Sequence, residues 1–146
     1  MENYAHTIIT PKITAFILPM VLLVVLLTIS IGLICSMKYT GISVGNGFLT
    51  VKSLFYGRKV PIGDINLEGV KSLNLDEERD KDYRITARTN GIGLPGYRVG
   101  WMILHNNHKA LTYITDRTKV VLIPTKDFDI LISTDDFDGI RNALSK

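Results

Sequence analysis

The chain has 146 residues, of which 17 are Lys or Arg and 14 are Asp or Glu, so its formal net charge is +3. This balance lacks the clustered basic face of a nucleic-acid-binding protein, and we expect no nucleic-acid partner. The single cysteine, Cys35, excludes an intramolecular disulfide bond and leaves the redox compartment open.

The chain is predicted to begin with a short tail, residues 1–12, and an apolar transmembrane helix, residues 13–37. The helix segment has no charged side chain, and Lys12 and Lys38 flank it. A helix of this length would be roughly 37 Å long, which is enough to cross a hydrocarbon core of about 30 Å. The two lysines can extend to the headgroups and mark the membrane boundary. The sequence therefore predicts a single-pass protein of the cell membrane, with the lipid bilayer as a partner.

Other interpretations of this segment fit less well. A cleavable signal peptide has an apolar region of about 7–15 residues and a small-x-small exit, whereas this segment is longer and ends in Ile-Cys-Ser-Met. A lipoprotein cleavage signal needs a small residue before Cys35, where Ile34 stands. A buried core helix or an interfacial helix is disfavoured because the segment is apolar on every face.

The flanking charges predict the sidedness of the helix. Lys12 and the terminal amine oppose Glu2 on one side, while Lys38 and Lys52 lie on the other side, with two more basic residues just beyond the usual counting range. The balance favours a cytoplasmic carboxyl-terminal domain.

Residues 39–146 suit one compact domain of ordinary size. Short apolar runs broken by Gly, Asn, Asp and Pro predict a sheet of short strands, and Gly45-Asn46-Gly47 supplies the positive-φ positions of a tight turn. Residues 76–82 alternate in charge sign and predict an exposed loop. The expected strands are residues 39–44, 48–56, 60–65, 65–75, 83–89, 99–104, 110–115, 119–124 and 128–132.

One helix is predicted near the carboxyl terminus. Ser133 is the expected N-cap, and two aspartates fall in the first turn, where they stabilise the positive end of the helix dipole. The apolar positions that follow are Phe137, Ile140 and Leu144, at spacings of three and four. We expect this helix to cover an open end or face of the sheet.

The order of the predicted strands and terminal helix resembles that of a known family, and several short sequence segments support this resemblance. The segments concerned are residues 91–101, 109–111, 113–116, 120–121 and 123–125. They resemble the bacterial pleckstrin-homology (PH) domain families, which often join such a domain to membrane helices. The resemblance implies a mainly β fold, in which a PH-like β-barrel of about seven strands is capped by a C-terminal α-helix. It also implies an adaptor or scaffold role without enzymatic activity or a cofactor.

The resemblance does not identify a ligand, because this fold hosts binding to lipids, peptides and proteins alike. Phosphoinositide-binding members carry a basic cluster across the first hairpin, where this sequence has Gly45-Asn46-Gly47. Inositol-phosphate binding is therefore not implied, and binding of a lipid headgroup stays an open alternative that no sequence feature supports. We expect a protein partner whose identity the sequence does not give.

Tyr97, Arg98 and Trp101 form the candidate binding surface. Tyr, Trp and Arg are the residue types enriched in binding hot spots. The alternative is that Trp101 fills the core of the domain, with Tyr97 and Arg98 at its edge.

The segment from Gly91 to Gly96 matches the dinucleotide pattern G-x-G-x-x-G, which suggests an alternative function as an envelope enzyme or a nucleotide-dependent regulator. That chemistry needs a helix after the glycines, and residues 97–104 are predicted to form a strand. A glycine-rich connection that passes close to another element fits better. His105 and His108 flank a predicted hairpin tip without further ligands nearby, so no metal site is expected.

Overall fold

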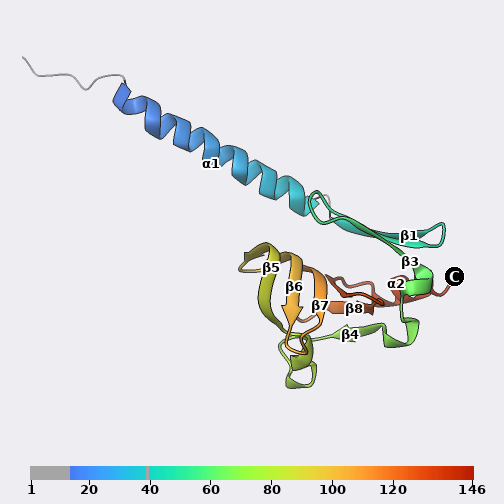
Figure 1. The fold of residues 1–146 in the computed structure, drawn as a ribbon. Helices are drawn as coiled ribbons and strands as arrows, with labels where there is room; N and C mark the ends of the chain where they lie inside the picture. Colours follow the sequence, from blue (N-terminus) through green and yellow to red (C-terminus); the bar gives the residue numbers. More distant parts are fainter. Residues whose placement is uncertain (1–13, 39) are drawn as a thin grey trace, which may run out of the picture. The chain divides into compact units, whose positions relative to one another are not determined.

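The computed structural model describes residues 14–38 and 40–146. The chain divides into two compact units, residues 1–38 and 39–146. Helix α1 (Thr14–Lys38) belongs to the first unit, and the second unit holds nine strands and helix α2 (Phe137–Leu144) among its described residues (Figure 1). Lys12, expected at one membrane boundary, lies outside the described residues, and Lys38 is the last residue of α1.

Helix α1 carries no charged side chain before its last residue, Lys38. Its stretch Ala15–Cys35 is long and apolar enough to cross a membrane, a test that a signal sequence near the amino terminus would also pass. The hydroxyls of Thr28 and Ser30 donate to helix carbonyl oxygens four residues earlier, both at 2.8 Å, so these polar groups are satisfied within the helix. The helix is therefore a candidate membrane span.

The first sheet of the domain has three antiparallel strands in chain order. They are β1 (Gly41–Gly45), β2 (Phe48–Lys52) and β3 (Arg58–Pro61). The predicted tight turn between β1 and β2 is confirmed, because Asn46 and Gly47 both have positive φ values, of 54° and 78°. The predicted second strand is shorter than expected: it ends at Lys52, and residues 53–57 form a loop before β3.

The second sheet has six strands in the order β4-β8-β9-β7-β6-β5. Their bounds are β4 (Lys71–Leu73), β5 (Ile85–Leu94), β6 (Tyr97–Leu104), β7 (Lys109–Ile114), β8 (Val120–Pro124) and β9 (Asp129–Ser133). All neighbours are antiparallel except β7 and β9, which are parallel because the β8–β9 hairpin places β9 between β7 and β8. The predicted β6–β7 hairpin is confirmed.

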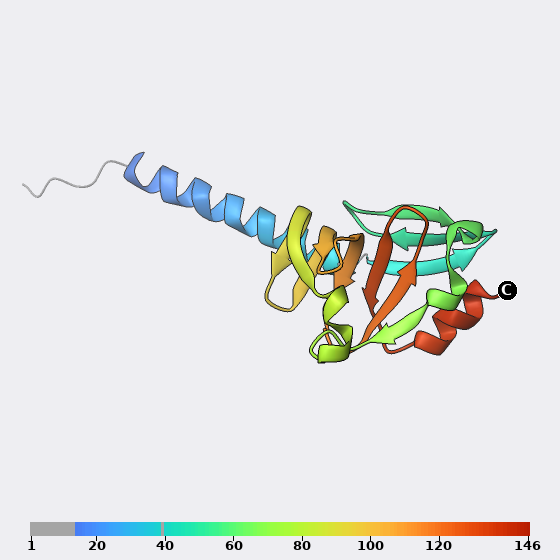
Figure 2. The same ribbon diagram turned by 60° about the horizontal axis from the view of Figure 1, so that its bottom comes forward.

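The main core lies between the two sheets, and α2 packs into it (Figure 2). It joins Leu49 and Val51 of β2 to Ile130 of β9 and to Ile140 and Leu144 of α2. The predicted role of the terminal helix is thus confirmed. The fold class is confirmed as well, although the two sheets do not close into one continuous barrel and the strands number nine among the described residues.

A second core lies on the opposite face of the six-stranded sheet. Leu104, Leu122 and Leu131 point into it, and the segment that follows β4 covers it with Leu75 and Tyr83. Both faces of the sheet are therefore buried, which explains why β8 and β9 read as continuous apolar runs in the sequence.

The strand predicted at residues 65–75 is mostly absent. A 3-10 helix, Leu67–Gly69, replaces its middle, and the Asn66 side chain accepts a hydrogen bond from the Gly69 amide at 3.3 Å. The predicted loop at 76–82 is largely exposed, but it contains the 3-10 helix Glu78–Tyr83, of which Asp80 is buried.

The predicted N-cap of the terminal helix is wrong. Asp136 is the N-cap, and its carboxylate accepts a hydrogen bond of 2.9 Å from the Gly139 amide. Ser133 instead ends β9, where its hydroxyl accepts from the amides of Thr115 and Asp116 at 3.0 Å. Ser133 therefore fixes the turn after β7, because the tertiary pairing of β9 brings it there.

Candidate functional site

The three residues of the predicted binding surface lie on strand β6 and do not form one surface. Tyr97 is buried, with 5% of its side chain exposed, and packs in the main core. Trp101 lies on the same face of the strand and is partly buried against that core. Arg98 lies on the opposite face, beside Met102 and Arg88. Of these three residues, only Trp101 lies at the accessible edge of the main core.

Trp101 is the centre of an aromatic-cation cluster. Phe128 packs edge-to-face on it, with ring centroids 5.0 Å apart and ring planes at 79°. The Lys109 ammonium lies 4.4 Å from the centroid of the Trp101 ring, and the Arg58 guanidinium carbon lies 5.5 Å from it. We call Arg58, Trp101, Lys109 and Phe128 the aromatic-cation cluster. It joins β3 of the first sheet to β6 and β7 of the second.

Among residues 14–38 and 40–146, neither Arg58 nor Lys109 takes part in an ion pair within 4 Å. Both side chains instead make cation–π contacts with Trp101. The cluster therefore offers positive charge and partly exposed aromatic surface together, which are the features of a protein-binding hot spot.

Two tyrosines hold the loop of residues 53–57 against the second sheet. The Tyr113 hydroxyl donates to the Tyr56 carbonyl oxygen at 2.8 Å, and the Tyr56 hydroxyl donates to the Asn90 side chain at 3.3 Å. Burial raises the pKa of the Tyr113 phenol above its ordinary value, so this donor stays protonated well above neutral pH. The loop therefore has a defined position beside the aromatic-cation cluster.

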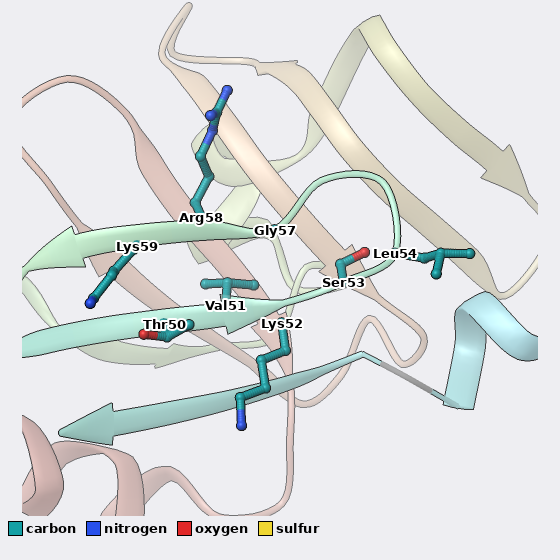
Figure 3. A pocket seen from close by; sticks show the side chains of 8 residues that line it. All are labelled: Thr50, Val51, Lys52, Ser53, Leu54, Gly57, Arg58 and Lys59. Atoms are coloured by element: carbon teal, nitrogen blue, oxygen red, sulfur yellow. The ribbon is translucent and has the colours of Figure 1, made fainter.

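A shallow hollow of about 540 Å³ lies at this end of the β2–β3 hairpin, lined by residues 50–54 and 57–59 (Figure 3). Lys52 and Lys59 project from the hairpin on the side away from Arg58. At the tip of the hairpin Leu54 is 53% exposed and Phe55 is 64% exposed. The loop thus presents apolar side chains between basic ones.

The charges of the domain are segregated along the chain. All its acidic residues lie within residues 64–82 and 116–138, and residues 39–63 and 83–115 contain none. The two acid-free segments form β1–β3 and β5–β7, and they contain seven basic residues: Lys52, Arg58, Lys59, Arg84, Arg88, Arg98 and Lys109. This pattern is visible in the sequence, but its meaning depends on the fold, which brings Arg58 of the first segment to Trp101 of the second.

The glycine-rich segment forms part of a hairpin and not a nucleotide-binding turn. Gly91 lies in β5 opposite Gly100 of β6, and Gly96 has a φ of 70° in the turn between the strands. Strand β6 follows this turn directly, so the helix that would hold a pyrophosphate is not there. The expectation of a glycine-rich connection in close backbone contact with another element is confirmed.

The two hairpin-tip histidines do not form a metal site. The Nδ1 atom of His108 lies 3.2 Å from a carboxylate oxygen of Asp129, while His105 is the first residue of the turn after β6. No group of three or more His, Cys, Asp or Glu side chains is arranged to hold a metal ion in the described part of the chain.

Comparison with known proteins identifies the family of this fold. The family model for the bacterial PH domain matches residues 40–146, which is nearly the whole of the second unit. The chain therefore belongs to the bacterial PH domain family, and the resemblance in the sequence is confirmed. No curated protein and no solved structure matches the chain.

Proposed function

We propose that this chain is a single-pass membrane protein whose bacterial PH domain acts as a non-catalytic binding or scaffold module for a protein partner at the membrane surface. Domains of this family are in general non-catalytic, and a binding role fits the fold. The apolar helix α1 supplies the anchor, and the charge balance around it favours a cytoplasmic domain.

The aromatic-cation cluster is the observation that carries this proposal. Trp101 and Phe128 are only partly buried against the main core, so part of each ring is available to a partner. Arg58 and Lys109 lie beside the Trp101 ring, and neither belongs to an ion pair in the described part of the chain. A partner segment could cover the aromatic surface with an apolar side chain and pair with the cations through an acidic one.

Photo-crosslinking in native membranes tests the cluster. A photoreactive amino acid in place of Lys109 of the full-length chain should capture a defined protein. The same amino acid in place of Ser72, which is exposed on the edge strand β4, is the matched control and should not capture it. The Arg58→Glu variant should abolish capture at position 109, while Arg58→Lys should retain it, because the charge and not the packing attracts the partner.

Alkaline extraction tests the anchor independently of the partner. The full-length chain should remain in the membrane pellet at high pH, as a protein with a spanning helix does. Release into the supernatant would overturn the membrane-anchored part of the proposal. Capture that is equal at positions 109 and 72, or that survives Arg58→Glu, would overturn the binding site.

A further inference from the structure

We propose that the loop of residues 53–57 docks on the anionic lipid surface of the bilayer that α1 crosses. Leu54 and Phe55 would enter the interface, and Lys52 and Lys59 would meet lipid phosphates. This inference rests on the proposed function, because it requires α1 to lie in a membrane.

The first argument is the exposure of the loop tip. Phe55 is 64% exposed and Leu54 is 53% exposed, whereas Leu49, Val51 and Val60 of the adjoining strands β2 and β3 are buried. The Phe55 ring makes an edge contact with Tyr56, with centroids 6.4 Å apart, so its main apolar surface stays uncovered. Adjacent exposed apolar side chains on a positioned loop are a mark of an interaction site.

The second argument is the charge around the tip. Lys52 precedes the loop and Lys59 follows it, and both project from the same side of the hairpin (Figure 3). The Lys59 ammonium lies 4.3 Å from the Phe48 ring centroid, and neither lysine belongs to an ion pair of the described residues. The segment of residues 39–63 has no acidic residue to oppose an anionic surface. Apolar side chains flanked by lysines suit the interface of an anionic bilayer.

The third argument is the short covalent connection. Gly41 pairs with Lys52 in the β1–β2 ladder, and two residues separate Gly41 from Lys38 at the end of α1. A connection of this length spans about 11 Å at full extension. Chain connectivity therefore allows the loop to reach the surface from which the helix emerges without a long linker.

Site-directed fluorescence in nanodiscs tests the docking. The full-length chain with Cys35→Ser receives one environment-sensitive fluorophore, at Phe55→Cys or at the control Ser72→Cys. Discs contain phosphatidylcholine alone or with phosphatidylglycerol, and doxyl-labelled lipid serves as the quencher. In anionic discs the fluorophore at position 55 should shift to the blue and be quenched, while the one at position 72 should not.

The charge dependence supplies a second readout. In the Lys52→Gln/Lys59→Gln variant the ratio of docked to undocked loop should fall roughly fivefold for each lysine removed. Discs without anionic lipid should reduce docking of the unchanged chain in the same way. Docking that is indifferent to both changes would overturn the electrostatic part of the inference.

The outcomes separate this inference from the proposed function. A chain that enters the discs while its fluorophore at position 55 stays as water-exposed as the one at position 72 overturns the inference alone. A chain that fails to enter discs overturns the membrane anchor and the inference together. Crosslinking of position 55 to a protein in native membranes, with no lipid quenching, would assign the loop to that partner and overturn lipid docking.

Discussion

The Tyr113 hydroxyl in β7 donates a hydrogen bond of 2.8 Å to the carbonyl oxygen of Tyr56, 57 residues earlier in the chain. This bond joins the six-stranded sheet to the loop that leaves β2. It is the contact that connects the core of the domain to both surfaces proposed for binding, because Tyr56 adjoins the exposed Phe55 on one side and lies two residues before Arg58 of the aromatic-cation cluster on the other.

We expect Tyr113→Phe to lower the free energy of unfolding by about 1 kcal/mol, because it removes a buried donor and leaves the Tyr56 carbonyl oxygen without it. Urea unfolding of the chain in detergent measures this change. Tyr56→Phe is the matched control: its hydroxyl bond to Asn90 is longer, at 3.3 Å, and exposed, so the loss should be smaller. Equal losses in the two variants would contradict this account.

The raised pKa of the Tyr113 phenol leads to a prediction for the free energy of unfolding at alkaline pH. Burial raises its pKa above the ordinary value of 10.0. The folded state then holds the phenol proton more tightly than the unfolded state does, so the resulting stability is fully present below pH 10.0 and is lost as pH rises through the folded-state pKa. The unfolding free energy of the unchanged chain should fall more steeply above that pH than that of Tyr113→Phe. Parallel curves would show that burial of the phenol has no such effect.

Glycine is required at one position of the β5–β6 hairpin and not at another. Gly100 has a φ of 117°, and an added Cβ would lie 2.5 Å from the carbonyl oxygen of Asn90. We expect Gly100→Ala to cost about 1–3 kcal/mol or more of stability. In Gly93→Ala the nearest atom to the new Cβ is a flexible Arg88 nitrogen at 3.7 Å, so stability should hardly change. Thermal unfolding of both variants measures the contrast, and a tolerated Gly100→Ala would argue against the strand register.

Strand β9 should be sensitive on both of its faces. Ile130 packs in the main core and Leu131 packs in the second core, and both are fully buried. We expect Ile130→Ala and Leu131→Ala each to lower the unfolding free energy by about 2–5 kcal/mol. The exposed Leu67 is the control, and Leu67→Ala should change stability by less than about 0.5 kcal/mol. A tolerated Leu131→Ala would mean that the second core is not closed in solution.

The Asp136 N-cap should affect the stability of helix α2 and not that of the rest of the domain. Asp136→Ala should weaken α2 by about 1 kcal/mol, because the Gly139 amide loses its acceptor. Hydrogen exchange of the α2 amides should then accelerate roughly fivefold, while exchange in β6 stays unchanged. Ser133→Ala is the control, since it should accelerate exchange at Thr115 and Asp116, whose amides it caps, and not in α2. Faster exchange of α2 in Ser133→Ala alone would restore Ser133 as the effective cap.

The predictions agree with the structure where a feature depends only on residues that are close together in the sequence. The strand predicted at residues 119–124 is β8 (Val120–Pro124), because a short apolar run that is rich in β-branched residues and ends at a proline indicates a strand. The tight turn at Asn46 and Gly47 is equally local, since positive φ angles are a property of these residue types. The strand predicted at 65–75 failed because the Asn66 side chain accepts a hydrogen bond from the Gly69 amide, and the strand-like spacing of Ile65 and Leu67, two residues apart, hides that competition.

The candidate site was predictable only in part. Trp101 was identified from its residue type, and Tyr97 and Arg98 were grouped with it because they are near in sequence. Strand geometry places Arg98 on the opposite face of β6 from Tyr97 and Trp101, and burial in the main core removes Tyr97 from the accessible surface. The actual neighbours of Trp101 are Arg58 and Lys109, and no pattern in the sequence indicates that β3 and β7 flank it.

The apolar helix, most strands and the terminal helix can be located from the amino-acid sequence, because each depends on side chains within a few residues of one another. The parallel pairing of β9 with β7, the burial of both faces of the larger sheet and the bond by which Tyr113 holds the loop beside Phe55 become evident only in the folded domain. These features join residues far apart in the chain. Their stability comes from packing and hydrogen bonds that exist only once the whole domain has folded.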